Sequence, residues 1–333
     1  MKVNIIAEAG VNHNGNIVKA KKLALEAKKI GADYVKYQIF NPDEIAIHNL
    51  KKTVYQKKNT RGDSDNQYDM LKKLSLTHKD FDKLIKYCKK INIKFLASVF
   101  DISSFNYLEK KSRIIKIGSS EISNFFLLKE IAKYNKNLII STGMCNFAVI
   151  KKALNLLYKN GQDKNKITLL HCNSAYPTPL SDANILTMNR LKDTFKVSVG
   201  YSDHTLGKDA VYAAVALGAN IIEKHFTLNK NLKGPDHKIS LDVGEFEEMV
   251  NGIRNITKTL NIKKGKLTKS EKENAALVKK FLVAKNYIKK GEKFSLENLT
   301  AKRTGGGIDS MKINTILNKK SKKFFLKNEI IKI

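Results

Sequence analysis

Each of eight short apolar runs along the chain ends in polar side chains that could do chemistry. These side chains belong to Glu8, Lys36, Gln38, Ser98, Lys116, Ser141, His171, Ser202, His204, Glu223 and His225. A single polar residue at the end of an apolar run means little, but the same arrangement at eight run ends predicts one shared site. Lysines and hydroxyls could bind phosphate or carboxylate there, and imidazoles could bind a divalent metal.

Two lysines, Lys36 and Lys116, lie inside otherwise apolar runs. A buried ammonium group is costly unless it has an anionic partner. We therefore expect an anionic ligand, with added hydrogen bonds from the hydroxyls of Ser98, Ser119, Ser141 and Ser202. Two alternatives remain open. The lysines could form structural ion pairs with carboxylates, here Glu8, Glu121 or Glu223, or one of them could form a Schiff base, as in pyruvate aldolases.

Two histidines, His204 and His225, follow the last two apolar runs. Neutral imidazoles at neighbouring strand ends can bind one divalent metal, with water and substrate completing its shell. Taken singly, either histidine fits a structural role. Because the two occur together beside Asp203 and Glu223, the sequence favours a metal site.

The apolar runs alternate with segments of helical spacing, which predicts the elements that position these residues. The runs read as buried strands at 3–7, 34–38, 94–98, 114–117, 138–141, 167–171, 196–199 and 220–223. Helical spacing occurs at 17–30, 78–91, 125–134, 148–160, 185–194, 209–217 and 243–260. Eight strands alternating with helices are typical of a (β/α)8 TIM barrel, whose active sites lie at the carboxyl ends of the strands. A doubly wound open sheet is the alternative, but no G-x-G-x-x-G follows the first strand.

The segment 41–76 interrupts this rhythm, because it separates the second strand from its helix by a long polar stretch. Loops of this length after a strand are usually functional. We expect a lid over the barrel mouth, with a disordered surface insert as the alternative.

The last part of the chain differs in composition from the barrel. We predict a barrel domain at 1–262, a Lys-, Ser- and Glu-rich linker at 263–276 and a small domain at 277–333. Short strand-like runs at 277–285, 291–294 and 299–303 indicate a β-rich module. It is too small to bury much core alone.

The charge is strongly positive, with 62 Lys and Arg against 31 Asp and Glu and a net charge of +31. Only five of the 62 are arginine, the residue that nucleic-acid readers favour. We therefore expect a lysine-rich surface and no nucleic-acid role, with a cationic binding protein as a remote alternative. We expect no membrane span and no signal peptide, and three scattered cysteines favour a reducing, cytoplasmic location.

The motifs that contain these residues resemble those of the sialic acid synthases. The matching segments, in order, are 6–15 (IAEAGVNHNG), 35–38 (VKYQ), 116–121 (KIGSSE), 141–144 (STGM), 176–179 (YPTP), 200–205 (GYSDHT), 223–227 (EKHFT) and 234–237 (GPDH). Near the end, Lys302-Arg303 followed by 305–308 (GGGI) is similar to the family's antifreeze-like (SAF, β-clip) domain. The resemblance covers essentially the whole chain.

The resemblance implies an enzyme that condenses phosphoenolpyruvate with an N-acetylated mannosamine-type sugar, giving a nine-carbon 2-keto sugar acid and phosphate. It implies carbon–carbon bond formation from the enolpyruvate C3, cleavage of the C–O bond to phosphate, and a divalent metal, Mn²⁺ or Mg²⁺, that polarises the aldehyde. N-acetylneuraminate synthase is the first expectation for the acceptor. N,N'-diacetyllegionaminate synthase, with 2,4-diacetamido-2,4,6-trideoxymannose as acceptor, is the alternative.

The resemblance also implies roles for single residues. His204 and His225 match the metal ligands. The residues that match the family's phosphoenolpyruvate-binding positions are Lys36, Ser98, Lys116, Ser119, Ser141 and Ser202. Sugar contacts match Glu8, Gln38, Tyr176 and Asp236, and Glu121 is a candidate acid/base near the attacking water. Arg303 matches an arginine that a second protomer lends to the sugar, so we expect a domain-swapped homodimer.

The sequence departs from the family pattern at three places near these residues. Ser98-Val99-Phe100 stands where the family usually has Thr-Pro-Phe, although Ser98 keeps the hydroxyl. Ser174 stands where some members carry Asn, and Thr304 replaces the Pro that normally follows the arginine. None of these departures removes a core group of the site.

Overall fold

A computed structural model describes residues 2–60, 64–260 and 265–332. The chain divides into two compact units, Met1–Asn261 and Ile262–Ile333. Each unit is described by itself below.

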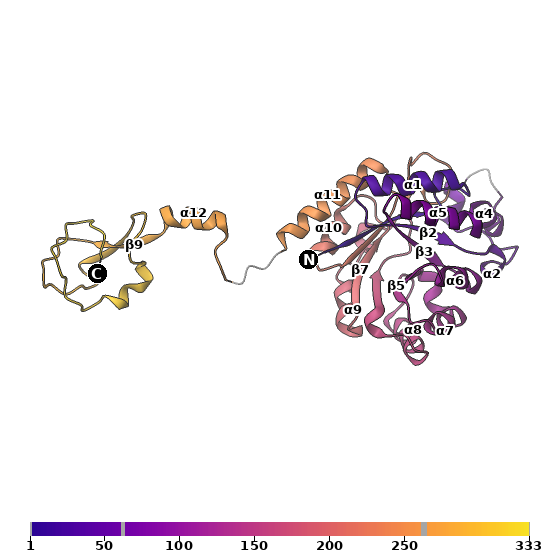
Figure 1. The fold of residues 1–333 in the computed structure, drawn as a ribbon. Coiled ribbons are helices and arrows are strands. Elements are labelled where there is room, and N and C mark those ends of the chain that lie inside the picture. The colour runs from indigo at the N-terminus through magenta and orange to yellow at the C-terminus, as the bar shows by residue number, and fades with distance from the viewer. Residues whose placement is uncertain (1, 61–63, 261–264, 333) are drawn as a thin grey trace. The chain divides into compact units, whose positions relative to one another are not determined.

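The first unit contains a closed barrel of eight parallel strands in the order β1 to β8 (Figure 1). The strands are β1 (Asn4–Gly10), β2 (Tyr34–Ile39), β3 (Lys94–Val99), β4 (Ile114–Ile117), β5 (Asn137–Ser141), β6 (Ile167–His171), β7 (Ser198–Asp203) and β8 (Ile221–His225). The TIM barrel predicted from the sequence is confirmed, and the open doubly wound sheet is wrong because β8 pairs with β1.

Helices surround the strands (Figure 1). They are α1 (Ile17–Lys29), α5 (His78–Lys90), α6 (Ile102–Glu109), α7 (Phe125–Ala132), α8 (Phe147–Lys159), α9 (Thr187–Phe195), α10 (Asp209–Ala216) and α11 (Val243–Thr259). Helix α6 has no counterpart among the predicted helices. It begins at the N-cap Asp101, whose carboxylate accepts from the Ser104 amide, and it buries Phe105 and Leu108.

Strand alternation separates two apolar layers. One side of each strand packs against the helices, and the other side points into the barrel. The inner layer is a small cluster of branched side chains from β1, β3, β5, β6 and β8, namely Ile6, Leu96, Ile139, Leu170 and Ile221. It fills the barrel interior, so the polar residues that point inward farther along the strands gather above it.

The segment between β2 and α5 contains three short helices. They are α2 (Pro42–Ile45), α3 (Val54–Asn59) and α4 (Gln67–Leu74). Thr53 and Gln56 form a capping box at the start of α3, which explains the helix in a polar stretch. The disordered insert considered from the sequence is therefore wrong for the described residues, which exclude 61–63.

The second unit has a small core of its own. Helix α12 (Lys269–Val278) precedes β9 (Lys280–Ala284), which pairs antiparallel with β10 (Leu299–Arg303). The core residues are Leu282, Ala284, Ile288, Phe294, Leu299, Ile316, Phe325 and Ile331. Residues 291–294 form no strand and contribute only an isolated bridge between Lys293 and Lys320.

Helix α12 lies largely within the predicted linker at 263–276. A capping box formed by Thr268 and Glu271 starts a helix at Lys269, and the helix continues to Val278. Residues 269–276 of the predicted linker are therefore helical, and positions 263 and 264 lie outside the described residues. Leu277, expected to begin a strand-like run, lies near the end of this helix.

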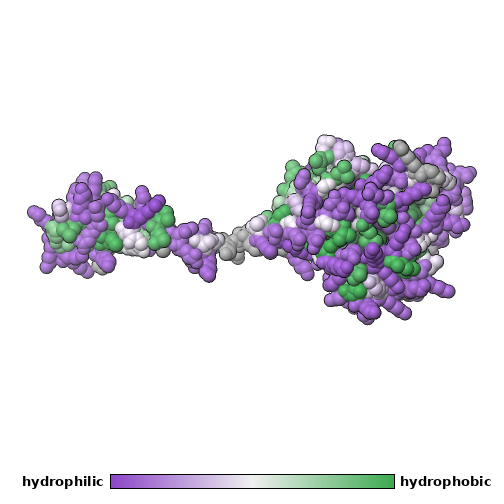
Figure 2. All heavy atoms as spheres, turned by 90° about the horizontal axis from the view of Figure 1, so that it is seen from above, coloured by the Kyte–Doolittle hydropathy of each residue, from purple (hydrophilic) through white to green (hydrophobic). Residues whose placement is uncertain are grey.

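Short 3₁₀ helices complete the secondary structure. They are η1 (Ser119–Ser123), η2 (Lys164–Lys166), η3 (Leu180–Asp182), η4 (His237–Ile239) and η5 (Ser310–Thr315). None of the helices in the described part of the chain has the length and apolar character that crossing a bilayer requires. On the face drawn in Figure 2, hydrophilic side chains predominate and apolar ones form scattered patches.

Candidate active site

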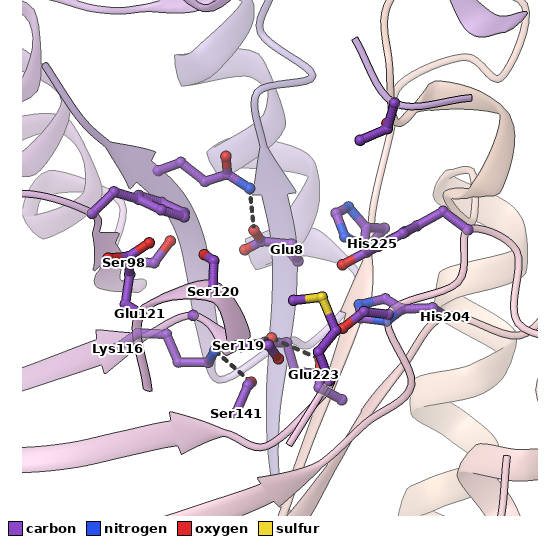
Figure 3. Close-up of a pocket in the computed structure, with 18 of the residues that line it drawn as sticks. Glu8, Ser98, Lys116, Ser119, Ser120, Glu121, Ser141, His204, Glu223 and His225 are labelled. Carbon is purple, nitrogen blue, oxygen red and sulfur yellow. Dashed lines mark hydrogen bonds and ion pairs between the residues drawn. The ribbon is translucent and has the colours of Figure 1, made fainter. Parts of the chain in front are cut away.

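A cavity of about 430 Å³ opens at the carboxyl ends of the barrel strands (Figure 3). Of the predicted site residues, twelve line it: Glu8, Lys36, Gln38, Ser98, Lys116, Ser119, Glu121, Ser141, Tyr176, Ser202, His204 and His225. Side chains far apart in the sequence meet here because a closed parallel barrel places all its strand ends at one face. Their chemical roles stay predictions.

The strand register explains why the charged residues lie at one level. Glu8 on β1 is opposite Lys36 on β2 and also opposite His225 on β8. Ser98 on β3 is opposite Lys116 on β4. Side chains at one level of neighbouring strands point to the same side of the sheet, here the barrel interior.

A buried ion cluster forms the floor of the cavity. Lys36 Nζ lies 2.8 Å from Glu8 Oε2 and 3.6 Å from Glu223 Oε2. Lys116 Nζ lies 3.7 Å from Glu223 Oε1 and donates to Ser141 Oγ at 2.7 Å. The pairing of both lysines with carboxylates, left open from the sequence, is therefore present in the structure.

The two carboxyls of this cluster differ in how they titrate. Burial tends to raise the pKa of Glu223, but Lys116 and Lys36 outweigh it and hold the pKa below its ordinary value. Burial does raise the pKa of Glu8, despite Lys36, and the Glu223 charge adds to the rise. Glu223 therefore stays ionised, whereas Glu8 takes up a proton more readily.

The two lysines also differ. For Lys36, the charges of Glu223 and Glu8 outweigh burial and raise the pKa. For Lys116, burial dominates and lowers the pKa. Lys36 therefore holds its proton more strongly than Lys116 does, because the carboxylates of Glu8 and Glu223 lie close to it.

A second part of the cavity wall is built from small side chains. The Gly143 amide donates to Ser119 Oγ at 3.1 Å, and Ser119 Oγ lies 3.2 Å from Cys172 Sγ. A Cβ at position 143 would overlap Ser174 Oγ and lie 2.9 Å from Ser119 Oγ. Glycine therefore allows hydroxyl and backbone donors to meet closely here, as an anion site requires.

The two histidines lie together on one side of the cavity, with Lys116 and Ser141 on the other and Glu223 between them (Figure 3). Their ring centroids are 5.5 Å apart. Burial lowers the pKa of both imidazoles, so both are neutral near pH 7. His204 Nδ1 contacts the Asn173 carbonyl oxygen. Because a carbonyl can only accept, Nδ1 carries the proton and Nε2 keeps its lone pair.

These residues fit a divalent metal with an open coordination shell. A backbone carbonyl that accepts from the far ring nitrogen, as Asn173 does for His204, is the usual partner of a metal-bound histidine. His225 Nδ1 is buried without a hydrogen-bond partner among the described residues, 3.9 Å from Asp236 Oδ2. In that same part of the chain, no cluster of three or more His, Cys, Asp or Glu side chains could hold a metal alone. Water and substrate would therefore complete the shell.

An ion pair on the outer side of the barrel fixes the strand ends that carry the histidines. Lys224 donates to Asp203 and to the Thr205 carbonyl oxygen, and both charged side chains are buried. Since Lys224 precedes His225 on β8 and Asp203 precedes His204, this pair ties the two segments together.

Two predicted residues lie outside the main cavity, whereas Tyr176 lines it and lies over His204, with ring centroids 4.3 Å apart. Asp236 lines an adjoining cavity, and burial, followed by the charge of Glu8, raises its pKa to about 7. Arg303 ends β10 in the second unit, where its side chain is exposed.

Residues to which the sequence assigned no role in binding or catalysis complete the walls. Glu223 was one of the polar residues at the run ends, with no role beyond a possible lysine partner; in the structure it contacts both lysines and accepts from Ser202 Oγ at 2.9 Å. The sequence signal that could have assigned Glu223 to the site is its place in the motif at 223–227, which also contains His225. The segment expected to act as a lid adds Ile45, Thr53, Tyr55, Gln56, Gln67 and Leu71. No sequence pattern indicated which of its side chains face inward.

Comparison with known proteins identifies the family of the chain. The model of the NeuB family matches residues 23–265, and that of the SAF domain matches residues 279–333. The chain is 48% identical to N,N'-diacetyllegionaminic acid synthase of Campylobacter jejuni over 99% of both chains. It is 39% identical to the enzyme of that name from Legionella pneumophila, over 94% of this chain and 88% of the other.

A solved structure gives the same result. The crystal structure of N-acetylneuraminic acid (sialic acid) synthetase from Leptospira borgpetersenii, in complex with citrate, matches with a TM-score of 0.71 and 32% identity. The match covers 82% of this chain and 90% of that chain. With a family model spanning most of the barrel and relatives of this identity, the chain belongs to the NeuB family of sialic acid synthase-type enzymes and carries a C-terminal SAF domain.

Proposed function

We propose that the protein condenses phosphoenolpyruvate with 2,4-diacetamido-2,4,6-trideoxymannose to form N,N'-diacetyllegionaminate and phosphate. The observation that carries this proposal is the 48% identity, over 99% of both chains, to a protein named N,N'-diacetyllegionaminic acid synthase. The order of acceptors expected from the sequence is thereby reversed, because N-acetylmannosamine was the first expectation. N-acetylneuraminate synthesis becomes the alternative.

The anionic substrate would be bound at the lysine and serine end of the cavity. We assign its phosphate and carboxylate to Lys36, Lys116 and the hydroxyls around Gly143. C3 of the enolpyruvate then attacks the aldehyde carbon of the open-chain sugar, forming the new carbon–carbon bond. The oxygen of a water adds at C2, and the C2–O bond breaks with its electron pair leaving on phosphate.

The attacking water gives up two protons in this sequence: one is lost as it adds at C2, and the other leaves the resulting C2 hydroxyl for the departing phosphate as the ketone forms. We assign acceptance of the first to Glu121, which lines the cavity beside Ser119. The aldehyde oxygen gains a proton as the carbon–carbon bond forms, and we assign its delivery to Glu8, because burial favours the protonated form of that carboxyl. Gln38, Tyr176 and Asp236 are assigned to the sugar.

His204 and His225 would hold the divalent metal, Mn²⁺ or Mg²⁺. When bound, the metal supplies Lewis-acid polarisation of the acceptor's aldehyde oxygen. The protein's contribution is to keep both imidazoles neutral by burial and to fix the His204 tautomer through the Asn173 carbonyl.

The test of the proposed function is a one-pot assay. The protein is incubated with phosphoenolpyruvate, Mn²⁺ and either 2,4-diacetamido-2,4,6-trideoxymannose or N-acetylmannosamine, and phosphate release and product mass are measured. We expect higher kcat/KM with the diacetamido sugar. A preference for N-acetylmannosamine supports the alternative, and no phosphate release with either sugar contradicts the proposal. Borohydride trapping of pyruvate on a lysine, insensitive to chelator, indicates an aldolase instead.

We further propose a homodimer in which Arg303 of one copy contacts the sugar in the barrel of the second copy. Support comes from the family resemblance around Arg303 and from its exposed position at the end of β10. We also propose a reducing, cytoplasmic location, supported by free thiols at Cys88, Cys145 and Cys172.

Mixing an impaired and an inactive variant tests the shared site. Arg303→Ala should raise the KM for the sugar more than that for phosphoenolpyruvate. Combined with a His204→Ala protein under conditions of subunit exchange, it should regain part of the activity, because one site of a mixed dimer has both residues intact. Absence of recovery after exchange has been verified by mass spectrometry argues against a shared site.

A further inference from the structure

A smaller cavity adjoins the main one and continues it toward the segment between β2 and α5. It has a volume of about 100 Å³. The two cavities share six lining residues, Gln38, Tyr55, Gln56, Leu71, Tyr176 and His225. Because His225 belongs to both, a ligand that reaches the histidine pair can extend a substituent into the smaller space.

Apolar and polar side chains contribute about equally to the walls of this side cavity. Apolar side chains come from three separate segments: Val11, Met70, Leu71, Leu74 and Pro235. Tyr55 adds a ring face that stacks on Tyr176, with centroids 5.0 Å apart. Gln38 and Asp236 provide polar groups, so a substituent entering this space meets both polar and apolar surfaces.

The apolar wall is rigid because its base is part of a packed cluster. Val11, Phe40, Met70 and Leu74 are buried together, with Leu71 packed partly against them. Leu71 lies three residues before Leu74 on α4, a spacing that brings side chains to one helix face. Leu71 is thus held in place by the residues beneath it while still lining both cavities.

We propose that this side cavity is the subsite for a methyl-bearing substituent of the acceptor sugar, with Leu71 as its specificity-determining residue. The inference rests on the proposed function and names how that site selects its sugar. The diacetamido acceptor carries a C6 methyl and a 4-acetamido methyl where N-acetylmannosamine carries hydroxyl groups. An apolar wall gains free energy from a methyl group, whereas a hydroxyl facing it loses hydrogen bonds to water.

The size of the space agrees with this assignment. A cavity of about 100 Å³ holds a group of a few heavy atoms, such as a methyl or an acetyl, and excludes a second sugar ring. One methyl group in such a pocket typically changes kcat/KM by about 10–200-fold. A preference of that order is therefore expected from Leu71 and its neighbours.

The test compares kcat/KM for two acceptors in Leu71→Asn, which replaces the wall by a polar side chain of similar size. The ratio of kcat/KM for the diacetamido sugar to that for N-acetylmannosamine should fall at least about 10-fold. Leu71→Ala is the second variant, because it tests the wall even if the polar substitution prevents folding, and it should lower the ratio in the same direction. Leu217→Asn, at the C-cap of α10 and outside both cavities, should leave the ratio unchanged.

A third acceptor distinguishes the two possible methyl groups. With 2-acetamido-2,6-dideoxymannose, which has the C6 methyl but no 4-acetamido group, a Leu71-dependent preference over N-acetylmannosamine assigns the subsite to C6. A preference seen only with the diacetamido sugar assigns it to the acetyl methyl. An active enzyme whose ratio is unchanged in folded Leu71 variants overturns the subsite alone. A wild-type enzyme inactive with every acceptor overturns the proposed function and the subsite with it.

Discussion

A His204→Ala variant should lose about 10³-fold or more in kcat/KM and should remain folded. Lewis-acid stabilisation contributes several kcal/mol to the barrier, and each 1.36 kcal/mol is a factor of about ten in rate. Removing one of two neutral imidazoles leaves His225 as the remaining histidine of the pair. Mn²⁺ binding, measured by equilibrium dialysis, should weaken in parallel with activity.

The matched control is His171→Gln. His171 is also a buried histidine at a strand end, but its Nε2 contacts the Ala183 carbonyl oxygen and it lies outside the cavity lining. Glutamine keeps a donor for that carbonyl, so Mn²⁺ binding should stay at the wild-type level. Equal Mn²⁺ affinity in wild type and His204→Ala contradicts the metal assignment even if activity falls.

Lys36→Met should abolish turnover and lower the free energy of unfolding by about 3–5 kcal/mol. The reason is that Lys36 lies within 2.8 Å of Glu8 and 3.6 Å of Glu223, and all three side chains are buried. Without the ammonium group, two carboxyls share a poorly solvated space, and Lys116 is the one lysine among the described residues that still pairs with this cluster. Urea unfolding followed by circular dichroism measures the loss.

If lost charge compensation destabilises Lys36→Met, removing a carboxyl should restore part of its stability. Combining Lys36→Met with Glu8→Gln removes one of the uncompensated carboxyls, so the double variant should be more stable than Lys36→Met alone. Lys133→Met is the control, because Lys133 forms an exposed pair with Glu130 and its loss should cost less than about 1 kcal/mol. A double variant no more stable than the single one rules out charge compensation as the role of Lys36.

Local sequence was sufficient to predict most of the barrel strands. The predicted limits of β4 and β6 match the structure. The prediction for β8 stopped at Glu223, whereas the strand continues to His225, because its partner β1 supplies hydrogen bonds up to Glu8. Strand ends are set by the neighbouring strand, and a single run of residues does not contain that information.

Two helices show where reading composition was misleading. Helix α12 lies in a stretch that resembles a linker, yet its Thr268 and Glu271 capping box is a local signal that was present in the sequence. Helix α6 is short, with only Phe105 and Leu108 as large buried apolar residues. A pattern of so few residues is too short to show helical periodicity clearly.

The sequence by itself determined which chemical groups this protein brings to its site: two buried lysines, two histidines and a set of hydroxyls at strand ends. Residue type and strand alternation are local properties, so they can be read before the fold is known. Only the tertiary structure decided that Glu223 lies between both lysines and that Leu71, from a separate helix, lines both the main cavity and the side cavity. Barrel closure and the packing of α4 create those contacts, and both depend on residues distant in the chain.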